Sequence, residues 1–143
     1  MPIVGFNFEK ITAEKKQLIK DKVNVKTDLH IVEVTEEAMP IAKSKEKILK
    51  FSFEFSINYE PKIGDIILKG HILYLDDQPK ITSIVKEWKK TKKIETKLME
   101  QLLNTILIRS NIKAFSLAQE VNLPPHIRLP IIKPTDKVGN YIG

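Results

Sequence analysis

The chain has 143 residues, of which 42% are hydrophobic and 29% are charged, and it contains no cysteine. This balance is typical of one soluble globular domain. The missing thiols exclude disulfides, thiolate metal sites and cysteine catalysis. No run of about 18 apolar residues occurs, so no membrane-spanning helix is expected.

The charge balance is basic, with 24 Lys and Arg residues against 18 Asp and Glu residues and a net charge of +6. Such an excess suits a polyanionic partner, but a lysine-rich solubilising surface explains it equally well. Lys and Glu enrichment without Cys is typical of hyperthermophile proteins, although an AT-rich genome also favours Lys and Ile. The start, Met1-Pro-Ile-Val-Gly5, lacks the pattern of a secretory signal, so a cytoplasmic location is predicted.

Alternation of apolar and polar residues predicts strands in the first half of the chain. It is clearest at residues 48–59, where the apolar side chains from Leu49 to Tyr59 share one face. Further strands are predicted near 2–12, at 29–34 and at 66–75, with a polar, lysine-rich loop between the first two. The strand at 66–75 is apolar on both faces, which predicts that a helix covers one face and a partner subunit the other.

Helical spacing begins after Asp77 and Pro79, residue types that favour a helix start. One helix is predicted over residues 79–88 and a stronger one over 94–110, followed by a further helical turn or two up to 121. Three prolines exclude helix and central strand from 122–130.

These elements predict one domain over residues 1–143. It comprises a sheet at 2–75, a helical region at 79–121, and a Pro-rich segment and tail at 122–143. Strands followed by helices indicate an α+β fold, in which C-terminal helices pack on one face of a four-stranded antiparallel sheet.

This order of elements, together with the phrase Asn122-Leu123-Pro124-Pro125, resembles the SecB export-chaperone family. That family has a four-stranded antiparallel sheet, a long helix and then an irregular segment rich in Leu, Asn and Pro. The resemblance covers residues 2–132 and implies a SecB-like fold and an ability to hold non-native polypeptide. The family is typically acidic whereas this chain is basic, so the resemblance implies no shared export pathway.

No pattern predicts a catalytic or cofactor site, so a non-enzymatic protein without metal or cofactor is expected. The paired acids at 36–37 and 76–77 are neighbours in sequence and therefore poorly placed to act on one reacting centre. Residues 116–124 resemble the start of a helix-turn-helix, but prolines occupy the place of its recognition helix. Three histidines lack metal-ligand spacing: His30, His71 and His126.

Surplus apolar surface predicts either a homo-oligomer interface or a groove for extended apolar polypeptide. The main hypothesis is therefore an oligomeric, SecB-like protein that holds unfolded polypeptide, with methionines giving its surface adaptability. The residues predicted for this surface are Met39, Ile41, Ile67, Leu73, Leu75, Met99 and Leu103.

The alternative hypothesis is a basic accessory protein that binds RNA or the ribosome through two lysine-rich segments, residues 86–97 and 10–26. In that interpretation lysines contact phosphates and Trp88 stacks on a base. In the structural interpretation the lysines form a solvated helix end and Trp88 packs inward, which its place on the apolar stripe favours. Lysines in place of arginines also argue against bidentate base recognition. The cluster comprises Lys86, Trp88, Lys89, Lys90, Lys92 and Lys93.

Overall fold

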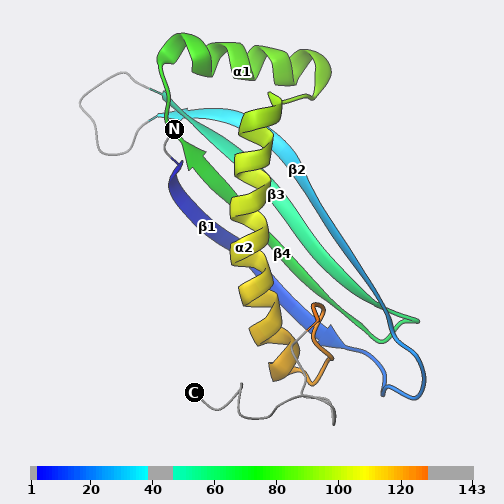
Figure 1. Ribbon diagram of the computed structural model, residues 1–143. Helices are drawn as coiled ribbons and strands as arrows, with labels where there is room; N and C mark the ends of the chain where they lie inside the picture. Colours follow the sequence, from blue (N-terminus) through cyan, green and yellow to red (C-terminus); the bar gives the residue numbers. More distant parts are fainter. Residues whose placement is uncertain (1–2, 39–46, 129–143) are drawn as a thin grey trace, which may run out of the picture.

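The computed structural model describes residues 3–38 and 47–128, which form one antiparallel sheet with two helices on one of its faces (Figure 1). In chain order the elements are β1 (Ile3–Lys15), β2 (Asn24–Ala38), β3 (Lys47–Glu60), β4 (Gly64–Tyr74), α1 (Gln78–Thr91) and α2 (Thr96–Glu120). The α+β fold predicted from the sequence is confirmed.

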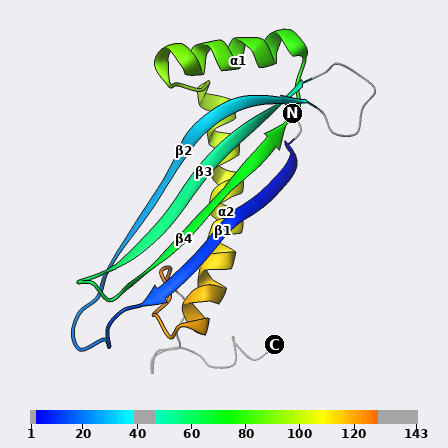
Figure 2. The ribbon, with the colours of Figure 1, turned by 180° about the vertical axis from the view of Figure 1, so that it is seen from behind.

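The sheet has the strand order β1-β4-β3-β2, so consecutive strands β1 and β2 form its two opposite edges. Residues 16–23, here called the crossover loop, carry the chain across one end of the sheet from β1 to β2 (Figure 2). The two edge strands are longer than predicted, because polar residues such as Asp28 pair through the backbone with β3. Hydrogen bonding between strand backbones does not require alternating apolar side chains, so these strand ends could not be predicted from the alternation of apolar and polar residues.

The inner face of the sheet, which faces the helices, holds the core. The inward side chains of β3 from Leu49 to Tyr59 alternate with outward polar ones, and each of these inward side chains is at most 1% exposed. The inward residues of β4 are buried as well. Helix α2 lies over them (Figure 1) with one buried residue at every fourth position. The buried side chains are large in the first half of the helix and small in the second: Leu98, Leu102, Ile106, Ser110, Ala114 and Ala118.

Helix α1 packs across one end of the same face, over β2 and β3. Its inward residues Ile81, Val85 and Trp88 join the core around Val34 and Phe51. Trp88 is only 6% exposed and packs inward, as the structural interpretation of that residue predicted.

The turn before α1 is organised by Asp76 and not by the predicted capping residue. Asp77 occupies the N-cap position but its side chain makes no capping hydrogen bond. Instead the Asp76 carboxylate accepts the Asp77 backbone N–H at 2.8 Å and the Tyr74 hydroxyl at 2.6 Å. Both hydrogen bonds hold the pKa of Asp76 below its usual value, with the tyrosine bond contributing most.

Helix α2 is one continuous element to Glu120, whereas the sequence predicted a break after residue 110. Ser110 and Asn111 disfavour a helix interior, but Ser110 is fully buried between helix and sheet, so packing overrides local propensity. The segment that resembles a helix-turn-helix, residues 116–124, therefore comprises the end of α2 and the first residues after it.

Gly70 on β4 provides a test of this packing, because no side chain fits there. A Cβ atom at Gly70 would lie 2.1 Å from the Asn7 backbone oxygen and 2.9 Å from Cζ of Phe53. At Gly5 the nearest atom is the flexible Cδ1 of Leu73, at 3.1 Å. We expect Gly70→Ala to lower the free energy of unfolding by about 3 kcal/mol and Gly5→Ala by less than about 1 kcal/mol. Urea unfolding of both variants measures the difference, and equal losses would contradict the packing described.

Candidate polypeptide-binding surface

The inner face is wider than the helix that covers it. A helix is about 10 Å across with its side chains, whereas the outer strands of a four-stranded sheet lie roughly 15 Å apart. The inward residues of β3 and β4 are fully covered, but those of β1 and β2 remain partly accessible on either side of α2. Two apolar strips therefore border the helix.

The β1 flank is the strip of inward residues on β1: Ile3, Phe6, Phe8 and Ile11. Ile11 is 43% exposed, and the ring centroids of Phe6 and Phe8 lie 5.1 Å apart in an edge-to-face pair. The Arg109 guanidinium of α2 lies 5.0 Å from the Phe6 ring centroid, within cation–π range. This flank therefore offers aromatic surface beside a positive charge.

The β2 flank consists of Val25, Leu29 and Ile31, which pair in register with the buried Tyr59, Phe55 and Phe53 of β3. Val25 is 37% exposed, and Leu29 and Ile31 are half-buried. Farther along the same strand Val34 is 3% exposed, because α1 covers it. The inward residues of β2 are therefore accessible only in the part of the strand that α1 does not cover.

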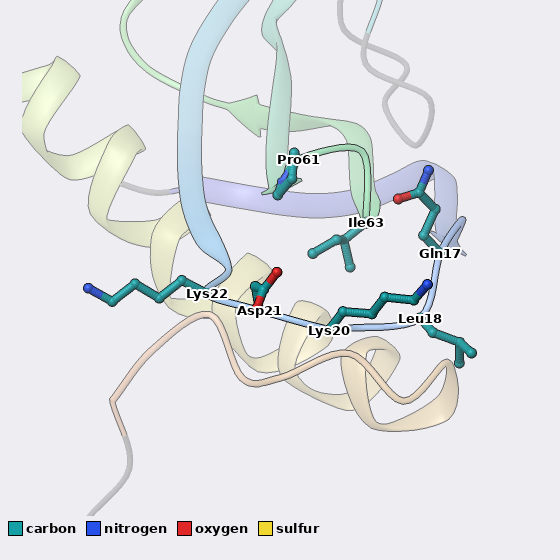
Figure 3. Close-up of a pocket in the computed structure, with 7 residues that line it drawn as sticks. All are labelled: Gln17, Leu18, Lys20, Asp21, Lys22, Pro61 and Ile63. Atoms are coloured by element: carbon teal, nitrogen blue, oxygen red, sulfur yellow. The ribbon is translucent and has the colours of Figure 1, made fainter.

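The crossover loop adds apolar surface at the end of the molecule away from α1. Its Leu18 and Ile19 are 75% and 40% exposed. The backbone N–H groups of Lys16 and Gln17 donate to the Ile63 carbonyl at 2.7 and 3.3 Å, which fixes the loop beside the β3–β4 turn. Between them lies a hollow of about 480 Å³, in which Ile63 points toward the loop and Leu18 points away (Figure 3). Its lining residues are Gln17, Leu18, Lys20, Asp21, Lys22, Pro61 and Ile63.

The segment after α2, residues 121–128, is here called the strap, and it closes the core at this same end. Asn122 has φ 57° and ends the helix, and the Leu123 backbone N–H donates to the Ala118 carbonyl at 2.8 Å. Asn tolerates this left-handed conformation better than most residues. The side chain of Leu123 is 5% exposed, and the Tyr59 hydroxyl donates to the Pro124 carbonyl at 2.7 Å. Burial raises the pKa of Tyr59 to about 12, so the hydroxyl remains a donor at neutral pH.

The outer face of the sheet is polar, and in the described part of the chain no further layer covers it (Figure 2). Cross-strand ion pairs join Lys50 to Glu37 at 3.5 Å and Lys69 to Glu54 at 4.0 Å. Glu9 sits at a β-bulge and pairs with His71, a hydrogen bond that lowers the Glu9 pKa. This face is neutralised largely by its own side chains.

The structure does not bring the predicted surface residues together. Ile67 and Leu73 point to the outer face, where they are half-buried among their strand neighbours, and Leu75 follows β4. Met99 and Leu103 are half-buried on α2, on the other side of the sheet. Met39 and Ile41 lie outside the described residues. The exposed apolar residues that sequence reasoning missed are on the edge strands, the crossover loop and the outward side of α2, where Ile108 and Ile112 are 63% and 69% exposed.

The three histidines lie apart, at β2, β4 and the strap. Among residues 3–38 and 47–128 no three His, Asp or Glu side chains converge as metal ligands would. Within the same residues, neither helix combines the length and the apolar character needed to cross a bilayer.

A solved structure resembles this fold over nearly its whole length: the Mycobacterium tuberculosis SecB-like chaperone Rv1957, in complex with a ChAD peptide from the Rv1956 HigA1 antitoxin. The TM-score is 0.51 with 13% sequence identity, and the match covers 94% of this chain and 92% of that chain. This likeness confirms the SecB-like fold predicted from the sequence. Comparisons with protein-family models and with curated proteins gave no match.

The strap contains a titratable group, His126, whose protonation opposes its packing. Its Nε2 donates to Asn111 Oδ1 at 2.8 Å, while Nδ1 is buried without a described partner. Burial therefore lowers the pKa of His126. In the unfolded chain the imidazole has an ordinary pKa of about 6.5, so the unfolded chain binds the proton more readily than the folded one. The contribution of His126 to stability is therefore fully present above pH 6.5. It is lost as the pH falls through the lower pKa of the folded protein.

We therefore expect the stability advantage of the wild type over His126→Gln to shrink between pH 7.5 and pH 5. Urea unfolding of both proteins across this range measures the advantage. Comparing the two proteins isolates the contribution of His126. A difference that does not vary with pH would contradict the buried, neutral His126.

Proposed function

We propose that this protein is a SecB-like, non-enzymatic binding protein that holds extended apolar polypeptide along the flanks of α2. The observation that carries the proposal is that inward residues of both edge strands remain accessible, whereas the inward residues of the central strands are fully covered. Apolar strips of this kind are where partner surface is normally buried.

The shape and chemistry of the flanks suit an extended chain. Each flank runs along part of an edge strand, and an edge strand also carries a row of unpaired backbone N–H and C=O groups. An extended segment lying there would bury alternate side chains against the flank, with aromatic contacts at Phe6 and Phe8. The complex of the fold neighbour with a peptide is consistent with this proposal.

Self-association is the second part of the proposal. Helix α2 presents Ile108 and Ile112 one turn apart on its solvent side, in addition to its buried row. A helix that is apolar on opposite sides is normally covered on both. We propose that a second copy of the chain covers this outward stripe, which leaves the flanks free for polypeptide.

The holding activity is tested with a chemically denatured client diluted into buffer, with light scattering as the measure of aggregation. The wild type should suppress scattering at a modest molar excess. The double variant Ile11→Ser, Val25→Ser removes one accessible residue from each flank and should raise the half-effective concentration about tenfold, equivalent to about 1.4 kcal/mol. These positions are exposed enough for the fold to tolerate serine.

The matched control is Ile67→Ser on the outer face of the sheet, which should behave like the wild type. If suppression is lost in Ile67→Ser and kept in the flank variant, the binding surface is the outer face and the proposal is wrong. No suppression by the wild type at several-fold excess would reject the holding function altogether.

Self-association is tested by size-exclusion chromatography with light scattering. The wild type should have a mass of at least twice the 16.5 kDa of one chain. The variant Ile108→Ser, Ile112→Ser should shift toward one chain, because it removes the outward stripe and leaves the core intact. The control Asn104→Ser, Gln119→Ser changes exposed polar positions on the same helix and should keep the wild-type mass. A monomeric wild type would contradict this part of the proposal.

A further inference from the structure

The positive charge of the chain is concentrated in one short stretch. Residues 86–97 contain six lysines and two glutamates, for a net charge of +4 out of the +6 of the whole chain. The stretch covers the second half of α1, the connection to α2 and the first residues of α2. The lysines, here called the α1 basic cluster, are Lys86, Lys89, Lys90, Lys92, Lys93 and Lys97.

All six lysines are exposed. Lys86, Lys89 and Lys90 lie on the solvent side of α1, which buries its other side in the core. None of the six forms an ion pair with any residue in 3–38 or 47–128, whereas sheet lysines such as Lys26 and Lys50 have carboxylate partners. Lys92 interacts instead with the face of Trp88, at 5.4 Å from the ring centroid. The cluster therefore presents positive charge that the described side chains do not neutralise.

The surface between these lysines is hydrophilic and recessed. A shallow hollow of about 450 Å³ runs along the exposed side of α1, lined by Pro79, Thr82, Ser83, Lys86, Glu87 and Lys90. Two ammonium groups and the Ser83 hydroxyl in this hollow are donors for an oxyanion. The Thr82 hydroxyl instead donates to the Gln78 carbonyl at 3.1 Å. Glu87 offsets part of the charge, and it accepts a hydrogen bond from the Thr91 hydroxyl at 3.0 Å.

The chemistry of the cluster selects among polyanions. A membrane-bound basic helix inserts its apolar side into the bilayer, but the apolar residues of α1 are committed to the core. A protein partner normally needs an apolar centre in the interface, and lysine is depleted there. A nucleic-acid backbone needs neither, because its affinity for lysines comes from the release of counterions.

We propose that the α1 basic cluster binds the phosphate backbone of nucleic acid without reading its sequence. Trp88 is buried and cannot stack on a base, and lysines lack the planar donor fork that recognises guanine. Binding is therefore purely electrostatic and independent of sequence. It uses a surface at the α1 end of the molecule, separate from the flanks, and it does not depend on the proposed holding function.

The test is fluorescence anisotropy with labelled RNA and DNA oligonucleotides of equal length and sequence, over a range of salt concentrations. We expect the two to bind with affinities within a few-fold of each other, and log K to fall against log salt with a slope of about −3 to −4, as for about four phosphate contacts. Lys86→Ala, Lys90→Ala, Lys93→Ala should weaken binding at least tenfold and reduce the slope by about 2 to 3.

The matched control is Lys10→Ala, Lys20→Ala, Lys22→Ala, which removes the same charge from exposed lysines that also lack ion pairs to described residues. It should lose less than threefold in affinity. Equal losses in the two triple variants would show that only net charge matters and would overturn the proposal. So would a flat salt response, a tenfold preference for one nucleic acid, or binding to anionic phospholipid vesicles but not to oligonucleotides. Unfolding midpoints and client suppression, measured on both variants, show whether either change disturbs the fold or the holding function.

Discussion

The mismatch in width between one helix and four strands determines how this molecule presents its apolar surface. Helix α2 covers the centre of the inner face, so Phe51, Phe53 and Phe55 are excluded from water. It does not reach the edges of the sheet, so Phe6, Ile11 and Val25 remain partly exposed to solvent. A second long helix over the same face would close both flanks, but α1 instead packs across one end. The accessible apolar strips are therefore a consequence of the architecture, and they lie on both sides of one element.

The two faces of the sheet handle charge and apolar surface differently. On the outer face, lysines and carboxylates from neighbouring strands pair with one another, and the few apolar residues there are half-covered by the sheet itself. That face has little driving force to bind anything. Among the described residues, the inner face leaves apolar strips uncovered, and the lysines at the α1 end have no carboxylate partner. Accessible apolar surface and positive charge thus lie on different parts of the molecule, where each can be altered without the other.

The sequence predicted most of the strands and helices, but it did not predict which of them lie next to one another in the fold. The alternation from Leu49 to Tyr59 predicted a strand with one buried face, and the stripe through Ile81, Val85 and Trp88 predicted a helix packed on the core; both predictions are confirmed. Which strands lie at the edges depends on the order β1-β4-β3-β2, and no local pattern encodes that order. Ile67 and Leu73 on an apolar strand were therefore predicted to belong to the surplus apolar surface, whereas Phe6 and Phe8 on the first strand were not. The continuity of α2 through Ser110 was missed for a related reason, since it depends on the sheet beneath it.

The phrase Asn122-Leu123-Pro124-Pro125, on which the sequence resemblance partly rested, has a local physical explanation in this chain. Asn122 adopts the left-handed conformation that ends a helix, and its N–H and that of Leu123 donate to the carbonyls of Gln119 and Ala118. This is the hydrogen-bond pattern of a Schellman motif, in which the residue after the left-handed one packs back on the helix, as Leu123 does. Proline follows because the helix cannot continue. Such a sequence stabilises the end of any long helix that stops over a sheet and places the following residue in the core. The phrase therefore stabilises the end of α2 and the core beneath it, whereas the accessible apolar surface lies on the flanks.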